Sequence, residues 1–212
     1  MIDLYTWQTP NGRKVSIMLE EIGIDYKVFP INIAKDEQFQ PHFLEISPNN
    51  RIPAIIDKDN NNYSLFESGA ILMYLAEKSG QLINKSNSDE YFRTIEWLMW
   101  QMGGIGPMFG QVHHFVKYNK GKSQYAEERY SKEARRLYGV MNKRLNNHQY
   151  ISGKEYSIAD ISIWPWTARF DWQEIDLNEY PNVARWYKEM IDRPAVQKGW
   201  LVPQNDQIIP KI

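Results

Sequence analysis

The chain has 212 residues, which is long enough for one large domain or two small ones. Its 25 Lys and Arg residues nearly balance its 26 Asp and Glu residues, which excludes the basic footprint of a protein that binds nucleic acid or anionic membranes. No apolar run reaches the roughly 20 residues that span a bilayer, and the N-terminus carries no signal pattern. We therefore expect a cytoplasmic protein whose partners are neither nucleic acids nor membranes.

Cysteine is absent from the sequence. This absence excludes disulfides, thiolate metal sites and a cysteine nucleophile supplied by the protein. Any thiol chemistry at this protein would therefore use sulfur atoms that arrive with a ligand.

The first eighty residues alternate strand and helix patterns. Short runs rich in β-branched and aromatic residues predict strands at 2–5, 26–31, 53–57 and 63–65. Apolar residues at helical spacing predict helices at 13–22, 38–45 and 67–77. This β-α-β-α-β-β-α order is typical of the thioredoxin-like fold, so we expect an α/β domain over residues 1–80.

The rest of the chain has helical patterns only. A stretch rich in Gly, Ser and Asn at 78–88 predicts an interdomain linker. Helices are predicted at 89–101, 108–119, 125–147 and 181–192, the last one ending at Arg193 and Pro194. The glycine-rich run 103–107 should kink or interrupt a long helix, and residues 157–160 (Ser-Ile-Ala-Asp) predict a capping box in which Asp160 caps a further helix. We expect an all-helical domain over residues 88–212.

The Ile52–Pro53 step opens the third predicted strand. A cis bond here would leave the backbone N–H and C=O of Ile52 outside the sheet, where they could pair with an extended peptide ligand. A trans proline at the start of an edge strand is the alternative interpretation.

Glu67 and Ser68 fall in the first turn of the helix that follows the fourth strand. The free N–H groups at that helix end and the Ser68 hydroxyl suit a carboxylate, while the Glu67 carboxylate suits an ammonium group. An α-amino acid presents both charges together, so the pair suits such a ligand. Plain helix capping is the alternative.

Thr9 and Asn11 flank Pro10 at the start of the first helix, and both carry donors that could stabilise a ligand thiolate. Lowering a thiol pKa from about 8.5 by two units needs roughly 2.7 kcal/mol. A helix N-terminus gives about 0.3–1 kcal/mol, and one or two hydrogen bonds to the thiolate could give the rest. A proline-containing loop with an Asn cap is the alternative. We expect Tyr5 to lie in the core and Ser16 to lie too deep in the helix to act on a thiol.

His113 and His114 suggest a metal site, but adjacent helical residues point about 100 degrees apart and do not easily share one ion. No cysteine or carboxylate cluster lies near them in the sequence, so we expect no metal. Pocket lining or a buried hydrogen bond is the role we expect for this pair.

Four stretches carry a resemblance to a known family: residues 9–12 (TPNG), 43–54 (FLEISPNNRIPA), 65–71 (LFESGAI) and 156–160 (YSIAD). Three more are specific to one branch of it: residues 97–101 (WLMWQ), 104–108 (GIGPM) and 111–115 (QVHHF). Over nearly its whole length the chain resembles the glutathione transferase superfamily, and most closely its nu-class bacterial disulfide-bond oxidoreductases.

The resemblance implies that glutathione is the co-substrate and that no metal is used. It implies that Glu67 and Ser68 hold the γ-glutamyl end and that the backbone of Ile52 pairs with the cysteinyl unit. Thr9 and Asn11 are the implied catalytic pair at the sulfur.

Three further residues take roles from the resemblance alone. Gln38 and Arg51 are expected to face the glycyl carboxylate, which suits an amide and a guanidinium. Arg129 matches a position that could reach the ligand, although a solvated charge on a helix is an equally good interpretation.

The resemblance favours a glutathione-dependent disulfide reductase that binds glutathione or glutathione disulfide and acts on a small-molecule disulfide. Two alternatives stay open, namely a transferase that conjugates glutathione to electrophiles and a non-enzymatic glutathione-binding regulator. A homodimer is also implied by the resemblance.

Overall fold

The computed structural model describes residues 1–204 and 207–212 and divides the chain into two compact units. The first unit contains Met1–Gln81 together with Asp192–Ile209, and the second contains Leu82–Ile191 together with Pro210–Ile212. The sequence predicted two domains that are each continuous in the chain, at 1–80 and 88–212. By packing, Asp192–Ile209 joins the first unit, so this unit is built from two segments that are far apart in the chain.

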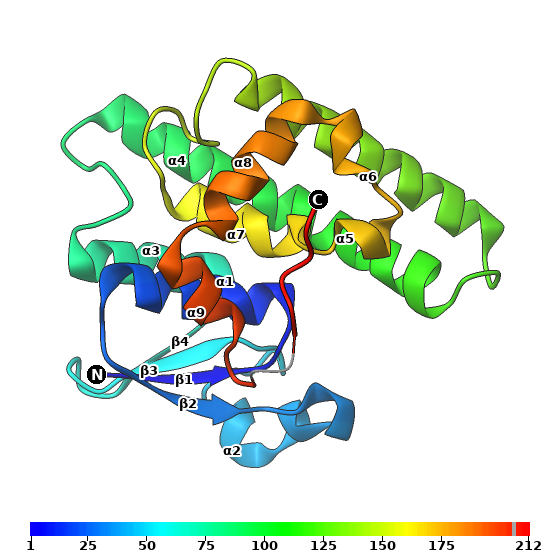
Figure 1. The fold of residues 1–212 in the computed structure, drawn as a ribbon. Coiled ribbons are helices and arrows are strands. Elements are labelled where there is room, and N and C mark those ends of the chain that lie inside the picture. The colour runs from blue at the N-terminus through cyan, green and yellow to red at the C-terminus, as the bar shows by residue number, and fades with distance from the viewer. Residues whose placement is uncertain (205–206) are drawn as a thin grey trace. The chain divides into compact units, whose positions relative to one another are not determined.

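The first unit is built on a mixed four-stranded sheet with strand order β2-β1-β3-β4 (Figure 1). Its strands are β1 (Ile2–Thr6), β2 (Tyr26–Pro30), β3 (Ala54–Asp57) and β4 (Tyr63–Phe66). β1 pairs with β2 in parallel, whereas the β1–β3 and β3–β4 pairs are antiparallel. This arrangement confirms the predicted thioredoxin-like fold.

Helices cover the sheet of the first unit, with α1 and α3 packed side by side over one face (Figure 1). The helical elements of this unit are α1 (Pro10–Ile22), η1 (Ile33–Lys35), η2 (Glu37–Phe39), α2 (Pro41–Leu44), α3 (Ser68–Ser79) and α9 (Pro194–Trp200). The helix predicted at 38–45 is divided into η2 and α2, because Gln40 precedes a proline and adopts an extended conformation with ψ of 139°. Phe43 of α2 packs with Ile31 and Ala54 in a small core.

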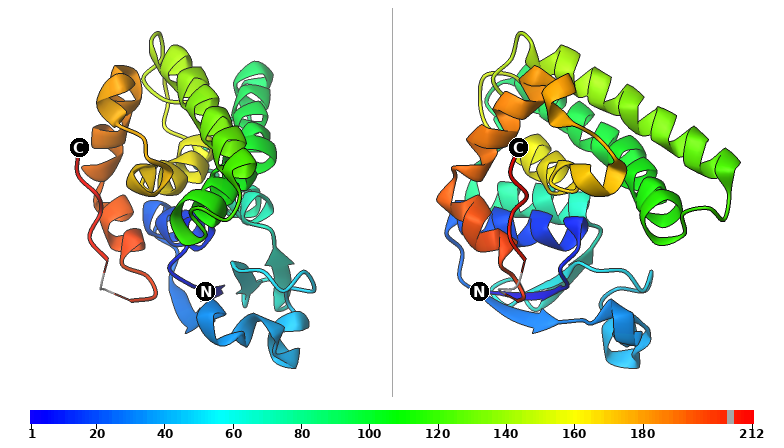
Figure 2. Two further views of the ribbon diagram at one scale, coloured as in Figure 1. Left: turned by 90° about the vertical axis from the view of Figure 1, so that its right-hand side faces the viewer. Right: turned by 45° about the vertical axis from the view of Figure 1, so that its right-hand side comes forward.

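The helix predicted at 181–192 ends before Pro194 as expected, but α9, which follows it, was not predicted. Pro194 begins this new helix at the first helical position, where its missing N–H costs nothing. The helix packs against α1, as Figure 2 shows from two sides. The hydroxyl of Ser16 donates to the carbonyl of Gly199 at 2.6 Å, and Arg193 makes a bidentate ion pair with Glu21 at 2.7 and 2.8 Å.

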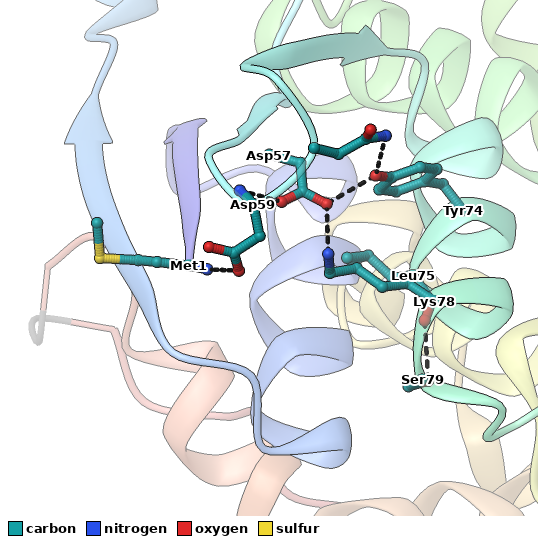
Figure 3. A network of polar contacts seen from close by, with 8 residues as sticks. Met1, Asp57, Asp59, Tyr74, Leu75, Lys78 and Ser79 are labelled. Carbon is teal, nitrogen blue, oxygen red and sulfur yellow. Dashed lines mark hydrogen bonds and ion pairs between the residues drawn. The ribbon is translucent and has the colours of Figure 1, made fainter.

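At one end of the sheet, a polar network ties the β3–β4 turn to α3 (Figure 3). The buried Asp57 carboxylate accepts from the Tyr74 hydroxyl at 2.6 Å and from the Asp59 amide at 3.0 Å, and pairs with Lys78 at 2.8 Å. Burial alone would raise the pKa of Asp57, but the hydrogen bonds from Lys78, Tyr74 and the Asp59 amide lower it below its usual value. The N-terminal ammonium of Met1 pairs with Asp59.

The second unit is helical throughout its regular elements. These are α4 (Ser88–Trp100), η3 (Gln101–Ile105), α5 (Gly106–Val112), η4 (His113–Tyr118), α6 (Gln124–Leu145), α7 (Ile158–Thr167), η5 (Phe170–Gln173), η6 (Leu177–Glu179) and α8 (Pro181–Ile191). The expected all-helical character is confirmed. At the glycine-rich run, the π-helical turn η3 interrupts the α-helix between α4 and α5, as the prediction allows, while the backbone continues through the turn.

The capping box at the start of α7 is confirmed, with Asp160 fully buried. Its carboxylate accepts from the Ile151 amide at 2.8 Å, the Trp186 indole at 2.9 Å, and the amide and hydroxyl of Ser157 at 3.1 Å each. Burial raises the pKa of Asp160 to about 6, against these hydrogen bonds, which favour its charged form. Within the described residues, no helix has both the length and the apolar composition to cross a membrane.

Candidate functional site

The three segments in which the sequence predicts site residues adjoin the sheet of the first unit at the same end. Ala54, the first residue of β3, pairs with Tyr5 near the end of β1 and with Phe66 at the end of β4. The loop into α1, the Ile52–Pro53 step and the start of α3 therefore begin next to one another. The register, rather than any single residue, assembles the candidate site.

Thr9 is the N-cap of α1, and its side-chain oxygen accepts from the Gly12 amide at 3.2 Å. The cap is therefore Thr9 and not the Asn of the alternative interpretation, and capping does not compete with a role at a thiolate. A hydroxyl that accepts from Gly12 still has its own hydrogen to donate. Asn11 lies in the first turn of α1 and is half-buried.

The Ile52–Pro53 bond is cis, which is one of the two interpretations that the sequence left open. The ladder between β3 and β1 begins at Ala54, so the N–H and C=O of Ile52 lie outside it. Ser47 holds this turn in place, because its hydroxyl donates to the carbonyl of Arg51 at 2.7 Å.

Glu67 lies between β4 and α3 with φ of 71° and ψ of 111°. A positive φ is unfavourable for a residue with a side chain and costs about 1–3 kcal/mol. Such strain is found at binding sites, where the surrounding structure imposes it. Glu67 is exposed, whereas Ser68, the first residue of α3, is 97% buried, with a relative exposure of 3%.

Lys14 is a member of this group that the sequence analysis missed. It lies in α1 and is fully buried, and its ammonium donates to the Ser68 hydroxyl oxygen at 3.2 Å. Burial lowers the pKa of Lys14 to about 7, although the negative charge of Glu67 acts in the opposite direction. Its spacing could have revealed it, because residue 14 precedes the apolar Met18 by four positions and Ile22 by eight.

Gln38 and Arg51 lie in the segment that connects β2 to β3 in the first unit. Gln38 is in η2, where its amide nitrogen lies 3.5 Å from Asp36, and its carbonyl oxygen is buried with no hydrogen-bond partner within the described part of the chain. Arg51 is exposed.

Two hydroxyl groups of the first unit have other roles, as expected. The ring of Tyr5 stacks on Phe29 with centroids 4.8 Å apart, and burial and the charge of Asp3 raise its pKa. Ser16 is fully buried and is bonded to α9.

Arg129 lies in the second unit, on α6. It lines a pocket of about 670 Å³ together with Met108, Tyr125, Glu128, Tyr130, Lys132, Glu133 and Arg136. Arg136 makes a bidentate contact with Glu133 at 2.7 and 2.8 Å, while Arg129 has no ion pair within residues 1–204 and 207–212. A cation without a salt bridge in a pocket wall can receive an anion.

His113 has a structural role in the second unit. It is 7% exposed, its ring stacks on Trp166, and its Nε2 lies 3.2 Å from the amide nitrogen of Gln173. Because that nitrogen donates, Nε2 accepts, and the imidazole is neutral. Burial and the charge of Arg169 lower the pKa of His113 to about 4.

The oxygen of the same Gln173 amide accepts from the buried Tyr138 hydroxyl at 2.6 Å. His114 is exposed, so the two histidines do not act together. In the part of the chain that the structure describes, no three His, Cys, Asp or Glu residues are grouped as for a metal ion.

Comparison with known proteins gives the same family from sequence and from structure. Family models match residues 1–77 (glutathione S-transferase, N-terminal domain) and residues 104–194 (glutathione S-transferase, C-terminal domain). The chain is 48% identical to the disulfide-bond oxidoreductase YfcG of Escherichia coli K12, with 96% of both chains covered. It is 39% identical to the disulfide-bond oxidoreductase YghU of the same organism, with 98% of this chain and 78% of YghU covered.

Two solved structures are similar over most of this chain. A glutathione transferase from Pseudomonas putida with one glutathione disulfide bound per subunit is 44% identical, with a TM-score of 0.89 and 95% of this chain and 91% of that chain covered. One from Burkholderia graminis with two glutathione molecules bound per subunit is 42% identical, with a TM-score of 0.89 and 95% and 88% covered.

Proposed function

Because the chain belongs to the glutathione S-transferase family, we propose that it is a glutathione-dependent disulfide-bond oxidoreductase that uses bound glutathione and no cysteine of its own. The observation that carries this proposal is the common end of the sheet at which the start of α1, Ile52 and the start of α3 meet. The names of YfcG and YghU favour disulfide chemistry over conjugation.

In the proposed complex, Glu67 takes the ammonium and Ser68 the carboxylate of the γ-glutamyl end. The backbone of Ile52 pairs with the cysteinyl unit in the manner of an added strand. Gln38 and Arg51 face the glycyl carboxylate. These contacts put the cysteinyl sulfur near the N-terminus of α1.

At that position the Thr9 hydroxyl and the Asn11 amide donate to the sulfur and favour its thiolate. About 2.7 kcal/mol of preferential stabilisation lowers the thiol pKa by two units. Thiol–disulfide exchange is fastest when the attacking thiol has a pKa near the ambient pH. The N-terminus of α1 contributes about 0.3–1 kcal/mol, and each hydrogen bond to the thiolate contributes about 1.5–3 kcal/mol. Together they supply the stabilisation that lowers the thiol pKa by two units.

The proposed reaction has two exchange steps. The bound thiolate attacks the substrate disulfide, which forms a mixed disulfide with glutathione and releases one substrate thiolate. A second glutathione thiolate attacks the mixed disulfide, which forms glutathione disulfide and releases the other substrate thiolate. Two glutathione thiols are oxidised and one substrate disulfide is reduced, so the electrons balance.

The test is the reduction of 2-hydroxyethyl disulfide by glutathione with a coupled reductase that recycles glutathione disulfide. Turnover with this disulfide supports the proposal. Turnover only with a chlorinated nitrobenzene would identify a conjugating transferase instead, and glutathione binding without turnover on either substrate would identify a binding protein.

Matched variants test the assigned roles. Thr9→Val removes the hydroxyl and should lower kcat, whereas Thr9→Ser keeps both the cap and the donor and should retain most of it. Asn11→Ala should also lower kcat more than it weakens binding, and Glu67→Ala should mainly raise the KM for glutathione. Equal losses of kcat and binding in all of them would contradict this division of roles.

The proposal extends to a homodimer in the cytoplasm, where the glutathione pool is reducing. Two large apolar side chains of α4 are exposed and could contribute to a subunit interface, with Phe92 at 64% and Met99 at 47% exposure. Light scattering after size exclusion should give twice the 25.1 kDa chain mass. The chain mass alone would contradict the dimer and leave the activity untouched.

A further inference from the structure

A fully buried lysine lies directly behind the candidate γ-glutamyl site. Lysine is almost never fully buried without a specific reason, because removing an ammonium from water is costly. Lys14 is 0% exposed and lies in α1, which packs against α3. An apolar residue at this position would give α1 and α3 a less costly contact, so packing does not explain the lysine.

When Lys14 is charged, its contact with Ser68 fixes the direction of one hydrogen bond. A charged ammonium has three donors and no acceptor, so at 3.2 Å the Ser68 oxygen accepts from it. The hydrogen of the Ser68 hydroxyl therefore points away from Lys14. A carboxylate that accepts this hydrogen would lie within about 6 Å of the ammonium, a range in which opposite charges interact strongly.

We propose that Lys14 is a positioning residue that provides the positive charge for the γ-glutamyl carboxylate, orients the Ser68 hydroxyl towards it, and takes up a proton when glutathione binds. The inference rests on the proposed binding of glutathione at Glu67 and Ser68. Lys14 itself does not touch the ligand, because it acts through Ser68 and through its charge.

The charges of the site match a zwitterion in this arrangement. The Glu67 carboxylate accompanies the ligand ammonium, and the Lys14 ammonium accompanies the ligand carboxylate. The pKa of Lys14 is lowered to about 7 by burial, so near neutral pH the lysine is only partly charged before the ligand arrives. A bound anion stabilises the charged form and draws a proton onto it.

Among the charged groups near α1, Glu67 at the start of α3 is the one whose charge acts on Lys14. The others on α1 have partners elsewhere, namely Arg13 (Trp200), Glu20 (Tyr26) and Glu21 (Arg193). On α3, Tyr74 and Lys78 pair with Asp57, and the remaining charged groups, Glu77 of α3 and Lys198 of α9, are exposed. The proton uptake is therefore assigned to Lys14.

Stability and binding should respond in opposite directions when the charge is removed. Replacing a buried charge by an apolar side chain of similar length is often neutral or stabilising for the fold. A purely structural lysine would not weaken ligand binding while leaving the fold as stable or more stable. Lys14→Met is therefore informative.

The experiment is isothermal titration calorimetry of the full chain with S-methylglutathione, whose blocked thiol does not titrate. Titrations at pH 7.5 in two buffers of different ionisation enthalpy give the number of protons taken up. The variants are Lys14→Met and, as a matched control at the other end of the sheet, the exposed Lys58→Met. Thermal unfolding of each variant is measured in parallel.

The wild type and Lys58→Met should each take up about 0.7 proton more than Lys14→Met, because a lysine with a pKa of about 7 is mostly neutral at pH 7.5 and the bound carboxylate returns it to the charged form. Lys14→Met should bind at least about tenfold more weakly, since a nearby opposite charge shifts such an equilibrium by a pKa unit or more. Its melting temperature should be equal to or higher than that of the wild type.

Binding of Lys14→Met within twofold of the wild type, or no proton uptake by the wild type, would overturn the inference. Should Lys14→Met fail to fold, Lys14→Gln takes its place, and the wild-type proton uptake still decides. A wild type that does not bind S-methylglutathione at all contradicts the proposed function instead. The two failures are therefore distinguishable.

Discussion

Gly199 gives the sharpest test of how α9 is attached to the first unit. A Cβ added at this position would lie 2.6 Å from the backbone N and Cα of Ile17 in α1, far inside the distance of ordinary contact. Backbone atoms of a helix cannot move aside as a side chain does, so Gly199→Ala should push α9 away. The movement would also break the 2.6 Å hydrogen bond from Ser16 to the Gly199 carbonyl.

The magnitude follows from these two losses. Overpacking costs about 1–3 kcal/mol, and the lost hydrogen bond costs about 1 kcal/mol, so Gly199→Ala should lower the free energy of unfolding by about 2–4 kcal/mol. Gly139 in α6 provides the matched control, because apart from its chain neighbours and the backbone of its own helix no atom lies within 4 Å of its added Cβ. Gly139→Ala should raise the free energy of unfolding by about 0.4–1 kcal/mol.

The assay is urea unfolding at one fixed protein concentration, since an oligomer would make the midpoint depend on concentration. The same substitution should thus have opposite signs at the two positions. A free energy of unfolding for Gly199→Ala within about 0.5 kcal/mol of the wild type would refute the close packing of α9 on α1.

Three further predictions concern the second unit. His113 keeps a pKa of about 4 in the folded chain against about 6.5 when unfolded, so the unfolded state binds the proton first as the pH falls. The free energy of unfolding should therefore drop by up to about 3 kcal/mol between pH 6.5 and 4, and His113→Gln should flatten this dependence while the exposed His114→Gln should not. Asp160→Ala removes the acceptor of four hydrogen bonds, three of them from buried N–H groups, and should lower the free energy of unfolding by about 3–5 kcal/mol in urea. A loss below about 1 kcal/mol would contradict the network. Arg129→Gln should raise the KM for the substrates of the proposed reaction without changing the unfolding midpoint. The control variant Arg135→Gln should leave both quantities unchanged. Equal KM values for the two variants would favour the interpretation of Arg129 as a solvated charge on its helix.

Local patterns in the sequence were enough to predict the order of the strands and of most helices, but not α9. The strand at 63–65, the capping box with Asp160 and the Ile52–Pro53 turn depend on residues close together in the chain, and all three are present. The family resemblance added the roles of the site residues, which a pattern of isolated residues leaves open. Thr9 illustrates this limit, because the same hydroxyl serves as a helix cap and is available to a thiolate.

The sequence thus determined the two kinds of domain, the absence of a protein thiol and the segments that form the candidate site. Tertiary structure alone decided that α9 returns to α1, that Lys14 is buried behind Ser68, and that Gln173 fixes the neutral form of His113. Each of these contacts joins residues more than fifty positions apart. A local sequence pattern does not indicate which distant residue will be the partner. Burial lowers the pKa of Lys14 and His113, and it arises only when the distant segments have packed together.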